Sequence, residues 1–197
     1  MPKLAKRTNP ARAANRPSEA YLPPIESGAT FDPSGVYRYH LWRVWDRSKP
    51  TIGWILLNPS TADERQDDPT IRRCIRNSQR WGFGRVTIGN IFAIRATLPS
   101  VMRAAEDPIG PGNDAALRTI VSESSLLMVA WGNHGLHRDR GEWVMRNVLH
   151  GAQPQCLGIT NLGAPIHPLY VAYDIERRAY RLPINHRPVA ERGSIAK

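Results

Sequence analysis

The sequence predicts an α/β domain in three layers, with a mainly parallel central sheet flanked by helices. Short, continuously apolar runs, typical of strands buried on both faces, alternate along the chain with segments of helical periodicity. Strands separated by helices are joined by right-handed crossovers, which make neighbouring strands parallel. The length of 197 residues suits one domain with a full core.

Each element follows from a local pattern. Residues 36–45 alternate around aromatic side chains and predict an antiparallel strand. Buried strands are predicted at 52–57, 86–92 and 126–130, and a short fourth strand at 155–160. Helices are predicted at 70–81, at 113–123, where Asn113 is a favourable capping residue, and at 139–149. The strand at 52–57 ends at Asn58-Pro59, because proline cannot continue a hydrogen-bonded ladder.

The two ends of the chain differ in composition from its middle. Residues 1–34 mix Pro, Ala, Asn, Ser and basic residues without apolar periodicity, which predicts a flexible basic arm, either solubilising or phosphate-tracking. One α/β domain at 35–185 and a basic tail at 186–197 complete the predicted organisation. Because the arm lacks the apolar stretch of a secretory signal and no run approaches a bilayer span, we expect a cytoplasmic protein without membrane contact.

The net charge of +10 favours an anionic partner. A positive field attracts polyanions, so DNA or a nucleotide is the expected partner, although some basic proteins are merely soluble. No obligate protein partner is inferred. Cys74 and Cys156 are the only cysteines, which excludes a Cys₄ zinc site and an iron–sulfur cluster and favours two reduced, buried thiols.

Neither a metal nor a cofactor is expected. His134-x-x-His137 has metal-ligand spacing but no third ligand at a characteristic distance in the sequence, and the neighbouring Arg138 and Arg140 disfavour a cation. The glycine-containing segments at 82–84 and 110–112 lack the dinucleotide and P-loop patterns and predict turns.

Polar residues follow several of the predicted strands. Asn58, Asn90, Trp131-Gly132 and His167 each lie at or just after a strand end. In open α/β sheets, ligands bind at the carboxyl ends of the strands, so these segments are expected to converge on one cleft.

The segment Leu57-Asn58-Pro59-Ser60-Thr61-Ala62-Asp63 is the most informative of these. It places an amide, two hydroxyls and a carboxylate directly after an apolar strand, although the same residues are also ordinary turn and helix-cap chemistry. We predict Asn58 and His167 as catalytic residues. The predicted substrate-binding residues are Pro59, Ser60, Asp63, Asn90, Phe92, Trp131, Leu169 and Tyr170. Phe92 could stack on a base or belong to the core, and a lone histidine is often structural.

Arginines gather around the predicted helix at 70–81. Arg65, Arg72, Arg73 and Arg76 are predicted to contact phosphates, and a solvated helix face is the alternative.

The chain resembles a family of uncharacterised bacterial and phage proteins, a domain of unknown function. The resemblance covers about residues 36–174 and rests on four motifs. These motifs are Leu57-Asn58-Pro59-Ser60-Thr61-Ala62-Asp63, Asp68-Pro69-Thr70-Ile71-Arg72-Arg73, Trp131-Gly132 and His167-Pro168-Leu169-Tyr170.

More remotely, the order of the motifs is similar to that of the uracil-DNA glycosylase superfamily. This resemblance implies a glycosylase-like fold, and it implies that Asn58 positions water, that Asn90 pairs with a base edge and that His167 stabilises the departing base. Leu169 or Tyr170 would then wedge into the stack as a base is flipped out. The expected function is action on the base–sugar bond of nucleic acid or a modified nucleotide, and the alternative is a non-catalytic nucleic-acid-binding module.

Overall fold

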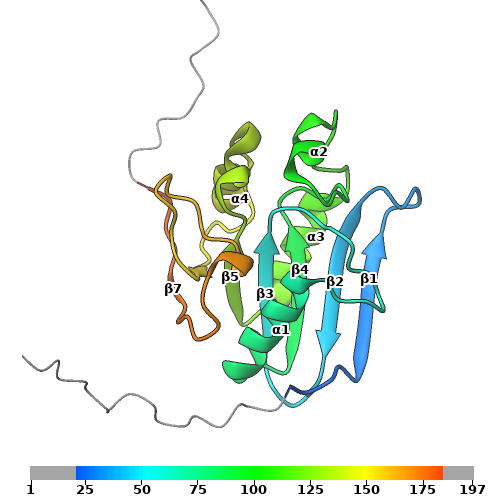
Figure 1. The fold of residues 1–197 in the computed structure, drawn as a ribbon, viewed down its shortest axis with the longest axis vertical. Helices are drawn as coiled ribbons and strands as arrows, with labels where there is room; N and C mark the ends of the chain where they lie inside the picture. The colour runs from blue at the N-terminus through cyan, green and yellow to red at the C-terminus, as the bar shows by residue number, and fades with distance from the viewer. Residues whose placement is uncertain (1–20, 184–197) are drawn as a thin grey trace, which may run out of the picture.

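Seven strands form one mixed sheet in the computed structural model of the protein, which describes residues 21–183 (Figure 1). The strands are β1 (Glu26–Phe31), β2 (Arg38–Val44), β3 (Thr51–Leu56), β4 (Arg85–Asn90), β5 (Leu126–Ala130), β6 (Gln155–Cys156) and β7 (Arg178–Ala179). Their order across the sheet is β1-β2-β4-β3-β5-β6-β7. The central four, β4-β3-β5-β6, are parallel, whereas β1, β2 and β7 are joined antiparallel. The α/β class is therefore confirmed, and the sheet is only partly parallel.

Helices cover both faces of the sheet. They are α1 (Pro69–Arg80), α2 (Pro99–Ala104), α3 (Asn113–Glu123) and α4 (Arg140–Asn147), with single-turn segments η1 (Asn133–Asp139) and η2 (Pro168–Tyr170). Helix α1 lies in front of the sheet and α3 behind it, so the three expected layers are present (Figure 1). Within residues 21–183, no helix is long and apolar enough to cross a membrane.

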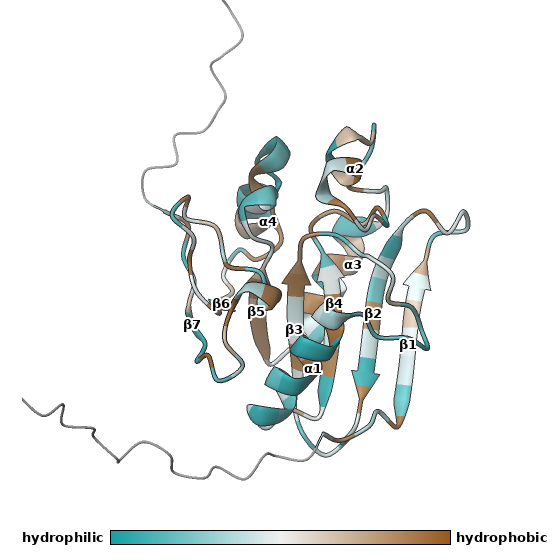
Figure 2. Cartoon of the chain, viewed as in Figure 1, coloured by the Kyte–Doolittle hydropathy of each residue, from teal (hydrophilic) through white to brown (hydrophobic). Residues whose placement is uncertain are grey.

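Strand β3 is apolar on both faces because it has a core on each side. Trp54 packs with the core cluster of α1, which includes Ile71 and Ile75, whereas Ile55 packs with the cluster that contains Leu117 of α3. Figure 2 shows hydrophobic colour along β5 and at the end of β3, and hydrophilic colour on α1. The continuous apolar run at 52–57 reflects this double burial.

The predicted helix at 70–81 is confirmed, and its first turn shows why it begins there. Asp68 caps α1, since its side chain accepts a hydrogen bond of 2.9 Å from the Ile71 amide, and Pro69 occupies the first turn, where an amide hydrogen is not needed. Helix α3 begins differently. Its cap is Gly112, and the buried Asn113 amide donates instead to the Asn90 and Ile91 carbonyls, which fixes α3 to the end of β4.

The sequence prediction differs from the structure at several places, and β7 was among the elements not predicted. Residues 26–31, inside the predicted flexible arm, form β1, which pairs along β2; a Cβ on Gly28 would collide with the Trp42 ring. Helix α2 was not predicted, and the strand expected at 155–160 is only two residues long. Residues 1–20 and 184–197, which hold the rest of the arm and the basic tail, lie outside the described part of the chain. Cys74 and Cys156 are both free and buried, as expected.

Candidate active site

A cleft of about 700 Å³ lies at the carboxyl ends of β3, β4 and β5. Its walls include Asn58 after β3, Asn90 at the end of β4, Trp131-Gly132 after β5, and His167 beside η2. Hydrogen bonds between neighbouring loops join these segments: the Ala96 amide donates to the Pro59 carbonyl at 2.9 Å, and the Gly132 amide to the Pro165 carbonyl at 2.7 Å. The structure thus brings together the polar segments that follow separate strands.

The side-chain amide of Asn58, which follows the carboxyl end of β3, has a fixed orientation. Its Nδ2 donates to the Pro59 carbonyl at 2.9 Å and to the Ala96 carbonyl at 2.6 Å. Both amide hydrogens are therefore used, and Oδ1 has no partner among the described residues. Asn58 presents a hydrogen-bond acceptor to the cleft. An aspartate here would place a carboxylate oxygen against two carbonyls, which explains on electrostatic grounds why the position carries an amide.

Asn90 is 2% exposed and lies in the wall of the cleft. Its Oδ1 accepts a hydrogen bond of 3.2 Å from Nη2 of Arg38. The Asn90 side-chain Nδ2 has no hydrogen-bond partner within residues 21–183 and is not sealed from solvent. Asn90 therefore presents a donor to the cleft.

His167 is held as a neutral imidazole. Its Nδ1 accepts from the Leu169 amide at 3.4 Å, so the neutral ring carries its proton on Nε2. Burial lowers the pKa of His167 to about 4, and the Asp68 carboxylate only partly opposes this shift. At neutral pH, His167 is a hydrogen-bond donor to the cleft and has no proton to transfer as an acid.

Two charged residues of the cleft were missed by the sequence analysis. Arg38 is 2% exposed, and burial lowers its pKa to about 10, so it stays cationic at neutral pH. Its guanidinium donates to the Ala62 carbonyl at 2.7 Å as well as to Asn90. Asp68, the cap of α1, also lines the cleft. The available signal for Arg38 was a charged residue inside a strand otherwise dominated by aromatic and aliphatic residues.

Trp131 and Gly132 mainly support the cleft. The Trp131 indole meets the Tyr180 ring edge-on at 6.2 Å and lies against Gly135 and Gly141, so its side chain belongs to the core although the residue lines the cleft. Gly132 has φ +65°, a conformation that favours glycine, and its amide joins the end of β5 to the loop before His167.

The rim of the cleft carries exposed apolar side chains. Leu169 is 43% and Tyr170 82% exposed, and the Tyr170 ring lies 5.7 Å from the His167 ring. Ser60 also lines the cleft, whereas Pro59 is buried and is not part of the lining.

Two predicted binding residues lie elsewhere. Phe92 is fully buried in the core behind the sheet, 5.8 Å from the His137 ring, so it belongs to the core and cannot stack on a ligand in the cleft. The Asp63 carboxylate accepts hydrogen bonds from the Arg65 and Gln66 amides at 2.8 and 2.7 Å, and these bonds lower its pKa. Asp63 therefore shapes the loop rather than the cleft wall.

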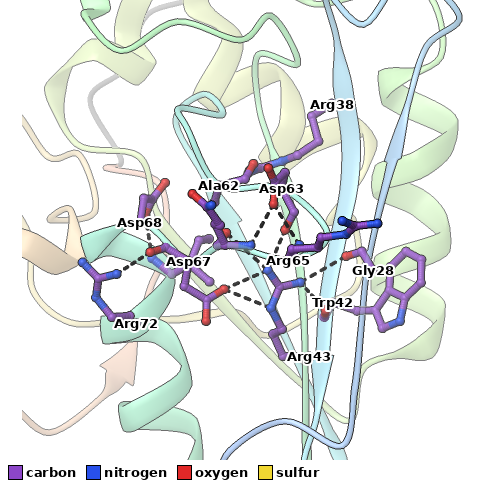
Figure 3. Close-up of polar contacts among 12 residues, drawn as sticks. Gly28, Arg38, Trp42, Arg43, Ala62, Asp63, Arg65, Asp67, Asp68 and Arg72 are labelled. Carbon is purple, nitrogen blue, oxygen red and sulfur yellow. Dashed lines mark hydrogen bonds and ion pairs between the residues drawn. The ribbon is translucent and has the colours of Figure 1, made fainter.

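Arg43 holds this loop on the sheet (Figure 3). It is 1% exposed, and it bonds the Asp67 carboxylate at 2.9 Å and the Asp63 carbonyl at 2.6 Å. It also donates to the carbonyls of Trp42 at 2.8 Å and Gly28 at 3.3 Å. One buried guanidinium thus joins β1, β2 and the loop that leads from Asn58 to α1.

The four predicted phosphate-contacting arginines do not share one environment. Arg65, Arg72 and Arg76 are exposed, and Arg72 donates to the Asp67 carbonyl. Arg73 is 9% exposed, donates to the Val171 carbonyl at 2.9 Å and lies 3.6 Å from the centre of the Tyr173 ring. Arg73 attaches the 171–173 segment to α1 and is not on the open surface.

The two histidines with metal-ligand spacing point to different neighbours. His134 Nδ1 lies 2.8 Å from Nη1 of Arg103, and the His137 ring lies beside Phe92. No group of three or more His, Cys, Asp or Glu side chains in the described chain could hold a metal ion.

Comparison with known families places the cleft in a wider context. The model of a family described as "protein of unknown function (DUF1643)" matches residues 38–169, which is more than half of the chain and runs from β2 to η2. The chain belongs to this family. The matched range contains the cleft segments after β3, β4 and β5 and reaches Leu169. No curated protein and no solved structure matches the chain significantly, so the similarity to uracil-DNA glycosylases stays a prediction.

Proposed function

We propose that the protein binds a nucleobase in the cleft and hydrolyses the base–sugar bond of nucleic acid or of a nucleotide. One observation carries this proposal: the acceptor Oδ1 of Asn58 and the donors Nδ2 of Asn90 and Nε2 of His167 line the same cleft. An acceptor can hold a water molecule, and two donors can hold the oxygen atoms of a base.

The dimensions and lining of the cleft fit such a ligand. Its volume of about 700 Å³ lies within the range of ordinary small-molecule sites. Leu56, Ile71 and Ile166 supply apolar surface for a flat ring, and the polar groups described above supply orientation. This combination of apolar walls and few directed polar groups is typical of specific ligand sites.

The chemistry requires little of the protein beyond orientation and charge stabilisation. The bond between the sugar C1′ and the base nitrogen breaks through an oxocarbenium-like state, and its electron pair leaves with the base. Asn58 Oδ1 accepts a hydrogen bond from the water whose oxygen bonds to C1′, and the proton of that water ends on the departing base. Neutral His167 stabilises the negative charge on the base by donating a hydrogen bond, since it has no acidic proton to give.

Features outside the cleft favour a polymeric substrate. The net charge is +10, and Arg65, Arg72 and Arg76 are exposed near the loop that follows Asn58. Leu169 and Tyr170 project at the rim, where an apolar wedge would fill the gap left by a flipped base.

A non-catalytic nucleic-acid-binding module is the second candidate. It is favoured by Asn58 itself, because an amide cannot take a proton from water at neutral pH. On this account, the same cleft holds an unpaired base without cleaving it.

The deciding experiment measures base release. The protein is incubated with single- and double-stranded oligonucleotides, and with nucleotides, that carry uracil, hypoxanthine or bulky modified pyrimidines, and abasic sites or free bases are scored. We expect release from at least one substrate, and a loss of about 100-fold or more in Asn58→Ala with binding retained. Asn147→Ala, at an exposed position on α4, is the matched control.

The alternative outcomes are distinct. No base release together with salt-sensitive oligonucleotide binding would replace the hydrolase with the binding module. Binding that does not weaken as salt rises would remove nucleic acid from the account altogether.

A further inference from the structure

The water that attacks the sugar has no proton acceptor in Asn58. A water molecule that bonds to C1′ loses a proton, and a side chain positioned to take that proton speeds the step. Asn58 orients the water through Oδ1, but an amide oxygen does not accept a proton at neutral pH. A base, if the cleft has one, must therefore come from another residue of its lining.

The two histidines that line the cleft in the described chain do not present a basic nitrogen. His167 Nδ1 accepts from the Leu169 amide, so its neutral ring carries an N–H at Nε2. His134 Nδ1 lies 2.8 Å from Nη1 of Arg103. Because a guanidinium only donates, this Nδ1 is the acceptor, and the proton of the His134 ring is also on Nε2. Both rings offer hydrogen-bond donors to the cleft.

Asp68 brings a carboxylate to the cleft, and no other Asp or Glu is among the described residues that line it. It follows the 63–67 loop that Arg43 holds on the sheet (Figure 3). Its Oδ1 accepts the hydrogen bond from the Ile71 amide that caps α1. Within residues 21–183, Oδ2 accepts no hydrogen bond and the carboxylate forms no ion pair. In that range, one oxygen holds the helix and the other is free to act on a water molecule.

The electrostatic effects of Asp68 reach two other groups of the cleft. Burial lowers the pKa of Arg38, and among the neighbouring charges the Asp68 carboxylate opposes that shift most strongly. Burial also lowers the pKa of His167, and Asp68 again opposes the shift. Segment η2, which follows His167, packs against α1. The carboxylate therefore lies within electrostatic reach of the cation in the cleft wall and of the imidazole that faces the departing base.

Capping of α1 does not by itself account for a charged side chain at this position. Asparagine and serine cap helices about as well as aspartate does. A negative charge in the cleft also repels the phosphates of a nucleotide or nucleic acid. Asp68 thus carries a charge that the cap does not require and that phosphate binding opposes, which is expected of a group that takes part in the chemistry.

We propose that Asp68 is the catalytic base of the cleft and that its Oδ2 takes a proton from the water that Asn58 orients. This inference rests on the proposed hydrolysis, and it assigns the proton transfer to the start of α1 rather than to the segment after β3. The water oxygen bonds to C1′, the bond from C1′ to the base breaks with its electron pair on the base, and the proton moves to Asp68. The departing base then takes this proton, which restores the carboxylate.

Asp68→Asn is the decisive variant. An asparagine oxygen still accepts from the Ile71 amide, so α1 keeps its cap while the base is lost. In the base-release assay described above, we expect kcat to fall about 100-fold or more, since general-base catalysis contributes about 10²–10⁴-fold. The KM and the urea midpoint should stay close to those of the wild type.

Asp46→Asn is the matched control. The Asp46 carboxylate also accepts from a backbone amide, that of Ser48, at 3.0 Å. It lies in the turn between β2 and β3, at the end of the sheet opposite the cleft. Its kcat should equal that of the wild type.

Added formate separates a lost base from a damaged site. Glycine is tolerated at a helix cap, so Asp68→Gly keeps α1 and leaves space for a small carboxylate. We expect formate to restore part of the base release of Asp68→Gly and none of that of Asn58→Ala. A loss in Asp68→Gly that formate does not restore would show that Asp68 acts through structure and would overturn its role as the base.

The outcomes also separate this inference from the proposed function. If the wild type and Asp68→Asn release base at the same rate, hydrolysis stands and Asp68 is only a cap. If the wild type releases no base from any of the substrates, the proposed function and the catalytic role of Asp68 fall together.

Discussion

Two arginines on the same strand, Arg38 and Arg43 of β2, show how different a buried cation can be in two parts of this molecule. Both are almost inaccessible, at 2% and 1% exposure. Arg43 is neutralised by Asp67 and donates to several backbone carbonyls that hold the 63–67 loop on the sheet. Within residues 21–183, Arg38 donates to Ala62 and Asn90, forms no ion pair with a carboxylate, and lies in the cleft wall.

The difference separates a structural charge from one that is available to a ligand. Removing one partner of a buried ion pair strongly destabilises the folded protein, because the other charge remains unpaired in a medium of low polarity. An arginine that is already unpaired has less to lose on substitution, and its positive charge acts on whatever enters the cleft. The two residues should therefore respond differently to the same substitution.

The largest effect is expected for Arg43→Met. The change leaves the Asp67 carboxylate and the carbonyls of Gly28, Trp42 and Asp63 without their donor. We expect the free energy of unfolding to fall by about 3–5 kcal/mol, measured by urea denaturation followed by circular dichroism. A loss below about 1 kcal/mol would show that Arg43 does not hold the loop.

A smaller effect is expected when only the charge of its partner is removed. Asp67→Asn keeps an acceptor oxygen for Nε of Arg43 but turns the ion pair into a neutral hydrogen bond, so Arg43 comes to resemble Arg38. We expect a loss of about 2 kcal/mol in the same denaturation experiment. If the variant were as stable as the wild type, the charge of Asp67 would not contribute to stability, and Arg43 would not differ from Arg38 in this respect.

Arg38→Met should be the mildest of the arginine variants. It removes the hydrogen bonds to Ala62 and Asn90, but it also removes a buried charge that forms no ion pair in the described part of the chain. These effects offset each other, so we expect the free energy of unfolding to fall by no more than about 1 kcal/mol in the same denaturation experiment. A loss equal to that of Arg43→Met would contradict the distinction.

The smallest expected effect on stability concerns His167, which lines the same cleft as Arg38. Its folded pKa of about 4 lies below the ordinary value of 6.5, so the folded state prefers the neutral ring. The resulting stabilisation is fully present above pH 6.5 and is lost as the pH falls toward 4. An NMR titration of the imidazole should give a midpoint near 4 in the wild type.

Asp68→Asn refines that measurement. The Asp68 carboxylate raises the pKa of His167, so the variant should lower the midpoint further, while an asparagine still caps α1 through its carbonyl oxygen. A midpoint near 6.5 in the wild type would show that His167 is solvated, and an unchanged midpoint in Asp68→Asn would place the carboxylate too far away to act.

The elements that the sequence predicted well are those with strong local patterns. β3, β5 and α1 follow from an apolar run or from helical spacing that one core on each side of the sheet enforces. β1 was missed because its residues carry little pattern of their own. It is a strand through its pairing with β2 and the close fit of Gly28 to Trp42, which are contacts that the local sequence does not display.

In the cleft, too, some residues could be predicted from local sequence patterns, whereas others are placed by tertiary contacts. Asn58, Asn90 and His167 could be grouped because strand ends of parallel strands meet at one edge of a sheet. The partners of Arg38 lie 24 and 52 residues away in the chain, and Arg73 is covered by a segment 98 residues away, so their environments are set by tertiary contacts. Phe92 was misplaced because its apolar run does not reveal which side of the sheet the residue faces.

One measurement tests the central claim directly: the NMR response of the side-chain amides of Asn58 and Asn90 and of the His167 imidazole to added uridine or inosine 5′-monophosphate. The account predicts that the Asn90 Nδ2 and His167 Nε2 protons shift with a common saturation curve, while the Asn147 amide on α4 does not move. Shifts confined to the surface arginines, with Asn90 and His167 unchanged, would contradict a nucleobase site in this cleft.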